Sequence, residues 1–192
     1  MVNGMYKWGL SKWDLKKAVE LAKKSVEYYD KRFGKGGSGN YQHNRLEGCL
    51  VGTKCEYATF GWLRWKMKGS GRKITADFEN LTSHTDVMCD QQKIEIKGLR
   101  NHQWDPFKRC IPPTQLDKYV KKNAIVIWAT CEADEKNPDV KLWGWNWASD
   151  VKDKGVFRKT ICDNIWLKDD KDMRSMDSLI DVLSENINSE SQ

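Results

Sequence analysis

The stretch that decides the fold runs from residue 85 to residue 98 and reads TDVMCDQQKIEIKG. Apolar and polar residues alternate on both sides of the Asp90-Gln91 pair. Alternation with a period of two predicts β-strands, and a short polar link between two such runs is typical of a hairpin. We therefore expect two strands, within residues 84–90 and 92–97, joined by a tight turn.

The second of these strands presents two charged side chains together. Residues two apart on a strand point to the same face, so Glu95 and Lys97 project on one side while Ile94 and Ile96 pack on the other. The hairpin would bring Asp86 beside Glu95. Two converging carboxylates are hard oxygen ligands for Mg²⁺ or Mn²⁺. The alternative is that all three charged residues are ordinary polar positions on a half-exposed sheet.

A metal ion held in this way would polarise a phosphate oxygen and lower the pKa of a bound water. Lys97 would orient or activate that water, and the backbone carbonyl of Ile96 could complete the metal shell. The motif alone is weak, and its value depends on the elements around it.

Those elements are expected in the order helix, three strands, helix, strand. A helix is predicted over residues 44–68 and the first strand over residues 73–79, ahead of the hairpin. Pro112-Pro113 opens a helix over residues 114–122, because proline is tolerated at a helix start. The apolar run 124–131 suits a central strand buried on both faces.

Further elements are expected on either side of this core. Ser11 is the predicted N-cap of a helix that ends near Phe33 and is followed by a Gly-rich break at residues 34–39. The expected C-terminal elements are a strand at 140–147, a short helix at 148–154, a strand at 165–167 and a helix at 176–183. The predicted units are an N-terminal helix and linker (1–40), a core (41–135) and a small C-terminal extension packed on it (136–192).

Within that order of elements, Thr85-Asp86 followed by I94-E95-I96-K97-G98 resembles the PD-(D/E)xK nuclease superfamily, which includes restriction enzymes, phage exonucleases and repair nucleases. The resemblance implies an α/β fold with a restriction-endonuclease-like core, a mixed sheet flanked by helices. It also implies Mg²⁺- or Mn²⁺-dependent hydrolysis of phosphodiester bonds, with the acidic residue and the ExK triplet as the centre. Thr85 stands where the family often has proline.

Two further motifs extend the resemblance. The family places a glutamate on the helix before the sheet, and Glu56 in the segment GTKCEYA fits that place. Glu47, nine residues earlier and about half a turn out of phase, is the alternative. Gln115 and Tyr119, four apart on the expected helix after the ExK strand, look like the QxxxY motif of the RecB-like and lambda-exonuclease-like branch. The likeness implies that they bind substrate by helping to position the scissile strand or the metal shell. The likeness covers residues 45–131, with a looser likeness in the tail to small phage-encoded nucleases.

The charge of the chain agrees with a polyanionic partner. Lys and Arg number 33 against 27 Asp and Glu, a net charge of +6, which favours nucleic acid, although many proteins with other partners carry as much. The predicted substrate contacts are basic residues in two segments, the turn after the second helix and the loop after the ExK strand: Lys66, Lys68, Arg72, Lys73, His102, Lys108 and Arg109. The alternative for both segments is a solvated surface. His84 is expected to be half-buried.

Six cysteines show no CxxC spacing and no zinc-ligand pattern. No apolar leader and no stretch of about 20 apolar residues is present, so we expect free thiols, a cytoplasmic location and no membrane partner. The sequence thus predicts a metal-dependent nuclease that acts on DNA. The alternatives are an RNA-directed nuclease, a non-cleaving nucleic-acid-binding protein on the same scaffold and, last, a structural role. A homo-oligomer is compatible with the sequence.

Overall fold

The computed structural model describes residues 4–34, 45–81, 85–159 and 163–185. Within these residues the chain forms a mixed six-stranded sheet, a small three-stranded sheet and helices on both faces of the larger sheet. The strands are β1 (Tyr6–Gly9), β2 (Ile74–Thr75), β3 (Val87–Cys89), β4 (Gln92–Arg100), β5 (Cys110–Ile111), β6 (Ile125–Cys131), β7 (Asp139–Trp147), β8 (Val156–Lys159) and β9 (Asp163–Trp166). The helices are α1 (Lys12–Phe33), α2 (Arg45–Lys66), α3 (Trp104–Phe107), α4 (Pro113–Lys121), α5 (Ala148–Lys154) and α6 (Met176–Glu185), with short 3-10 turns η1 (Asn101–Gln103) and η2 (Asp170–Asp172).

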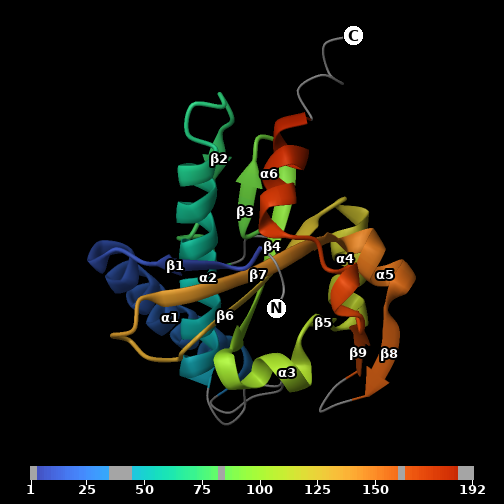
Figure 1. Cartoon of the computed structure of the whole chain (residues 1–192). Coiled ribbons are helices and arrows are strands. Elements are labelled where there is room, and N and C mark those ends of the chain that lie inside the picture. The colour runs from blue at the N-terminus through green and yellow to red at the C-terminus, as the bar shows by residue number, and fades with distance from the viewer. Residues whose placement is uncertain (1–3, 35–44, 82–84, 160–162, 186–192) are drawn as a thin grey trace.

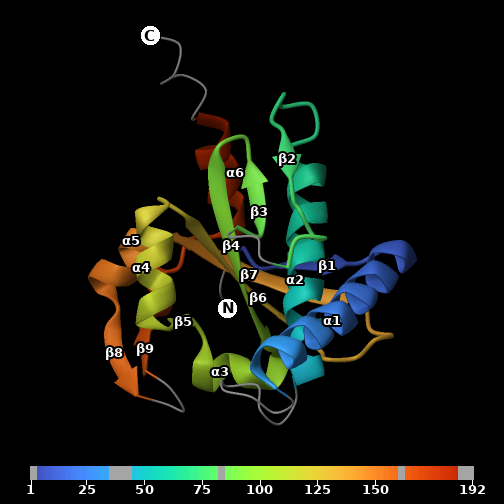
Figure 2. The ribbon, with the colours of Figure 1, turned by 180° about the vertical axis from the view of Figure 1, so that it is seen from behind.

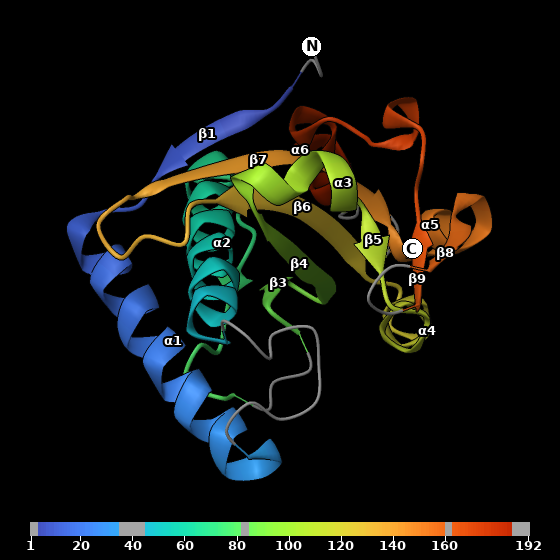
Figure 3. The same ribbon diagram turned by 90° about the horizontal axis from the view of Figure 1, so that it is seen from below.

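The larger sheet has the strand order β1-β7-β6-β4-β3-β2. β4 and β6 pair in parallel, and the other neighbours pair antiparallel. Helices α1 and α2 lie on one side of the molecule, and α4 and α5 lie on the other with the small sheet β5-β9-β8 (Figures 1 and 2). Seen from below, the sheet is curled between these two layers (Figure 3). The expected α/β fold, a mixed sheet flanked by helices, is confirmed at this level.

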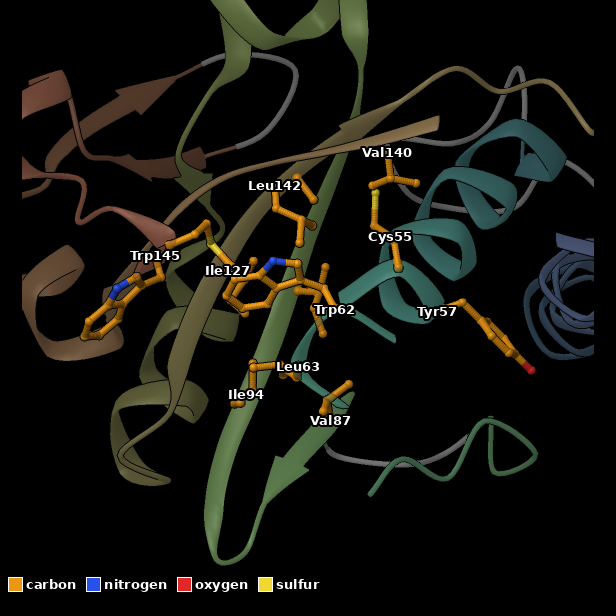
Figure 4. Packing of buried hydrophobic residues seen from close by; sticks show 14 of the residues in the cluster. Cys55, Tyr57, Trp62, Leu63, Val87, Ile94, Ile127, Val140, Leu142 and Trp145 are labelled. Atoms are coloured by element: carbon orange, nitrogen blue, oxygen red, sulfur yellow. The ribbon is translucent and has the colours of Figure 1, made fainter. Parts of the chain in front are cut away.

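The sheet separates two hydrophobic cores, and β6 contributes to both. Ile125 and Ile127 pack in the core under α1, α2 and α6, while Val126 and Trp128 pack in the core under α4 and α5. All seven residues of β6 are buried, which confirms a strand covered on both faces. Figure 4 shows the first core, where Trp62 of α2 lies among side chains of the sheet.

Several expected elements form close to their predicted bounds because local signals specify them. Ser11 caps α1, its hydroxyl accepting from the backbone N–H of Asp14 at 3.1 Å. β3 and β4 pair with Cys89 opposite Gln92, so Asp90 and Gln91 form the tight turn. Asp90 takes a left-handed backbone (φ 50°), a conformation that aspartate tolerates better than most residues.

Other elements differ from the prediction. The first strand was expected over residues 73–79, but β2 spans two residues, because Phe78 stacks on Tyr57 of α2 with ring centroids 4.0 Å apart and so leaves the line of the sheet. β1, β5, β8 and the short helix α3 were not predicted, and α3 lies in the segment expected to be a loop after the ExK strand. β1 is a four-residue strand that pairs with β7 along the sheet edge, and so short a segment carries little periodicity. β9 begins two residues earlier than expected.

The sheet also crosses the unit boundaries expected at residues 40 and 135, because β1 and β7 belong to the same sheet as β4 and β6. Asn44, His84 and most of the Gly-rich break lie outside the described residues. The cysteines in the described part, Cys49, Cys55, Cys89, Cys110 and Cys131, are free thiols. No helix in that part combines the length and the apolar character that crossing a membrane requires.

The contact between β7 and the C-terminal segment leaves no room for a side chain at Gly144. The neighbouring Trp145 and Arg174 exchange backbone hydrogen bonds of 2.9 Å. A Cβ at Gly144 would lie 2.4 Å from the carbonyl oxygen of Arg174 and 2.7 Å from Cγ of Met173. The glycine therefore permits the close approach that joins this segment to the sheet.

We predict that Gly144→Ala lowers the free energy of unfolding by about 1–3 kcal/mol, the range for overpacked sites. Chemical denaturation measures the change. Gly9→Ala is the control, since no atom of the described residues lies within 4 Å of a Cβ placed there. Equal stability of the Gly144 variant and wild type would contradict the predicted clash.

Candidate functional site

The site begins where the β3–β4 ladder ends. The last paired residues are Val87 and Ile94. One residue before β3, the Asp86 side chain replaces a strand partner, and its Oδ2 accepts from the backbone N–H of Ile96 at 2.6 Å. The two strands separate at this point, so the hairpin holds Asp86 against the E-I-K segment by a side-chain hydrogen bond.

Lys97 is the residue at which the two predicted motifs meet. Its Nζ donates to Oε1 of Gln115 at 2.9 Å and lies 4.9 Å from the ring centroid of Tyr119. Both partners are on α4, one turn apart and on one face. The Gln-Tyr pair therefore contacts the ExK lysine directly.

Lys122 belongs to the same site and was not predicted. Its Nζ lies 3.3 Å from Oε1 of Glu95, whose side chain is buried. Positions 115, 119 and 122 share one face of a helix, so the spacing held a usable signal. However, Lys122 lies at the C-cap of α4, where a lysine is also expected simply to interact with the helix terminus, so the spacing alone does not single it out.

Burial and mutual repulsion perturb the carboxyl groups. Desolvation raises the pKa of Glu56 to about 8, helped by the charges of Asp86 and Glu95 and opposed by Lys97. Desolvation and then Asp86 raise the pKa of Glu95 to about 7, against the lowering effect of Lys122 and Lys97. The carboxyl groups thus influence one another although they come from α2, β4 and the segment before β3.

The remaining two groups respond to the same burial. Desolvation raises the pKa of Asp86, opposed by the Ile96 N–H and by Lys97. Desolvation lowers the pKa of Lys97, opposed by the surrounding carboxylates. Perturbed ionisable groups gather at functional sites more often than elsewhere, so these four residues form the candidate site.

The structure separates the two candidate helix glutamates. Glu47 forms an ion pair with Arg100, with an N–O distance of 2.8 Å. Glu56 is the one whose pKa responds to Asp86, Glu95 and Lys97. No group of three or more His, Cys, Asp or Glu side chains in the described part of the chain is arranged to hold a metal ion.

Four of the predicted basic substrate contacts make internal contacts. Lys66 donates to the Tyr6 hydroxyl at 2.8 Å and pairs with Asp177. Arg72 bonds Asp90 at 2.8 Å and the carbonyl of Ser184 at 3.1 Å, so both residues tie α6 to neighbouring elements.

Arg109 and Lys108 hold the turn before the small sheet. Both pair with Asp170, and the Arg109 guanidinium also donates to the carbonyls of Leu167 and Lys168 at 2.8 Å. Arg109 is 1% exposed, so its guanidinium does not face solvent. The other predicted contacts, Lys68, Lys73 and His102, are exposed.

Comparison of the chain with protein-family models, with curated proteins and with solved structures gave no match.

The raised pKa of Glu56 predicts a pH-dependent cost in stability without metal. The ordinary value is 4.5 and the folded value is about 8, so folding takes up a proton between these pH values, and this contribution to stability falls as pH rises through that window. In EDTA, Glu56→Gln should match wild type near pH 4.5 and exceed its unfolding free energy by on the order of 1–3 kcal/mol at pH 7.5.

Urea denaturation at several pH values measures this difference. Glu27→Gln, at an exposed position on α1, is the control, and its unfolding free energy should follow that of wild type at both pH values. A Glu56→Gln variant that gains no stability between the two pH values would mean that Glu56 is ionised at no cost.

Proposed function

We propose that this protein is a metal-dependent nuclease that hydrolyses phosphodiester bonds in DNA. The observation that carries the proposal is the position of Lys97, which contacts Gln115 and Tyr119 of α4 on one side and responds to Asp86, Glu95 and Glu56 on the other. Residues from four separate segments thus surround one ammonium group. A half-exposed sheet surface gives no reason for this convergence.

The oxygen donors are of the type that a hard divalent cation prefers, and they would draw together around the ion, since the described carboxylates are not already grouped as a metal site. Asp86, Glu95 and Glu56 supply carboxylate oxygens. Burial raises the pKa of all three, and repulsion from Asp86 adds to the effect at Glu56 and Glu95. Mg²⁺ or Mn²⁺ would relieve that repulsion. Asp86 and Glu95 would bind the ion with the carbonyl of Ile96, and Glu56 would bind directly or through water. Such an ion polarises a phosphate oxygen and acidifies a bound water.

Lys97 would transfer a proton to or from the attacking water, and the residues around it would hold the side chains of the site in position. Lys97, whose pKa is lowered by burial, can exchange a proton with the attacking water and can neutralise charge that develops on the phosphate. Gln115 and Tyr119 fix the direction of the Lys97 side chain. Lys122 holds Glu95 from the opposite side.

The order of elements supports a restriction-endonuclease-like core. Helix α2 is followed by β2, β3 and β4, then, after the short elements η1, α3 and β5, by α4 and β6, and the strands of the larger sheet lie in the order β6-β4-β3-β2. This is the helix, three strands, helix, strand order of the PD-(D/E)xK superfamily. The net charge of +6 fits a nucleic-acid partner, and the free thiols fit a reducing cytoplasm.

We predict that the purified protein cleaves DNA in Mg²⁺ or Mn²⁺ and is inactive in EDTA. Glu95→Gln and Lys97→Ala should each lower the rate by about 100-fold or more, since a positioned acid or base contributes about that much. The assay compares linear duplex, circular duplex, single-stranded DNA and RNA. Lys121→Ala, an exposed lysine on the same helix as Gln115, should retain activity.

The controls separate the alternatives. Equal cleavage by wild type and both site variants would identify a contaminating nuclease. Binding of nucleic acid without cleavage, with every substrate and metal, would replace the nuclease with a non-cleaving binding protein. Cleavage of RNA alone would keep the chemistry and change the substrate.

We also predict that Mg²⁺ or Mn²⁺ stabilises the folded protein. A ligand at 100 times its Kd stabilises by about 2.7 kcal/mol, so the melting temperature should rise with metal concentration. Asp86→Asn and Glu95→Gln should abolish the rise. Asp117→Asn, which alters an exposed pair with Lys152, should preserve it, and a rise that survives in the site variants would place the metal elsewhere.

A further inference from the structure

A pocket lies beside the candidate site, between α1, α2 and the segment that follows β2. Its volume is about 400 Å³, and Glu56 and Asp86 form part of its lining. Pockets for small molecules have volumes of roughly 300–1,000 Å³. A group bound here would touch two of the carboxylates proposed to bind the metal.

One face of α2 forms a wall of this pocket and carries two glycines. Arg45, Gly48, Cys49, Gly52 and Glu56 all line it, and their spacing of three or four residues places them along one face of the helix. The glycines leave a recess between Arg45 and Glu56.

Packing among the described residues does not explain Gly52. Glycine is less favourable in a helix interior than any residue except proline, and Gly52 lies in the middle of α2. Among the described residues, and apart from the backbone of its own turn of helix, the only atom within 4 Å of a Cβ placed there is Oε1 of Glu56, at 4.0 Å. The described residues therefore leave this space open to a ligand.

Aromatic rings border the pocket on two sides. Tyr29 and Phe33, one turn apart on α1, are 38% and 48% exposed, with stacked rings whose centroids lie 6.2 Å apart. Phe78 lines the pocket from the segment after β2 and is held in place by Tyr57. Asp77 and Asn80 add polar groups to the lining. Aromatic faces beside a few polar groups suit a nucleobase, which stacks on a ring and hydrogen-bonds at its edge.

We propose that this pocket binds one unstacked nucleobase with its sugar, from a single-stranded stretch of DNA, and thereby places the adjoining phosphate at Asp86 and Glu95. The inference rests on the proposed nuclease function for the position of the phosphate. A base paired within a duplex must leave its stack to enter such a pocket. Single-stranded DNA and frayed ends are therefore the preferred ligands.

The test uses the full chain and single-stranded DNA that carries 2-aminopurine, a fluorescent base, at one position at a time. Binding is measured in EDTA, without cleavage, by fluorescence anisotropy of a label at one end. In wild type, the 2-aminopurine emission should change at one position and little at the others. Gly52→Leu should weaken binding of the single strand by about 10-fold or more and abolish the position-specific change.

Matched variants distinguish a loss of binding in the pocket from a general loss of folded structure. Gly9→Leu adds the same side chain where no described atom lies within 4 Å of a new Cβ, and it should bind as wild type. Tyr29→Leu combined with Phe33→Leu should weaken binding as Gly52→Leu does, while Tyr29→Phe should not. Phe157→Leu removes an exposed ring (63% exposed) on β8 and should have no effect.

The outcomes distinguish this inference from the proposed function. If wild type cleaves DNA and Gly52→Leu keeps both its affinity and the 2-aminopurine change, the pocket proposal is overturned and the nuclease stands. If nothing is cleaved but the fluorescence results are as expected, the pocket stands and the nuclease fails. Equal 2-aminopurine changes at every position, or no binding of single-stranded DNA, would also overturn the pocket proposal.

Discussion

The hydrogen bond from the Ile96 N–H to the Asp86 carboxylate is the constraint on which the site depends. β4 is paired with β6 along residues 94–100, but its pairing with β3 stops at Ile94. Beyond that point the outer edge of β4 needs an acceptor, because a buried backbone N–H without one is costly. Asp86 supplies it at 2.6 Å. One interaction therefore ends the ladder, opens the sheet and places a carboxylate beside Glu95.

The packing around the site offsets the electrostatic cost of burying its charged groups. Burial disfavours the charged forms of Glu56, Asp86, Glu95 and Lys97, so the folded state gives up stability here. The two hydrophobic cores on either face of the sheet fix the strands that carry these groups. Functional sites commonly retain such local cost because activity requires it.

Local patterns made part of this structure predictable. The hairpin, the cap at Ser11 and the buried strand β6 follow from alternation, a capping side chain and an apolar run, all visible within a few residues. β1 could not be predicted, because its pairing with β7 joins residues 130 or more positions apart. The same limit applies to the internal contacts of Arg109, since no local sequence signal predicts its carbonyl partners, Leu167 and Lys168, 58 and 59 residues away.

One face of α2 carries both Glu56, beside the proposed metal site, and Gly52, beside the proposed base pocket. Glu56 responds to the carboxylates at one end of that face, and Gly52, one turn earlier, leaves the space that borders Tyr29 and Phe33 of α1. A rigid helix fixes the distance between these positions, so a base held in the pocket would have its phosphate in register with Asp86 and Glu95, the proposed metal ligands. The contacts between α1 and α2 include the hydrogen bond that the Thr53 hydroxyl donates to the carbonyl of Ala18 at 2.9 Å. They hold the rings of Tyr29 and Phe33 in place beside α2. Under the proposed function, the N-terminal helix α1, which lies outside the segment that resembles the nuclease superfamily, would take part in choosing the substrate strand.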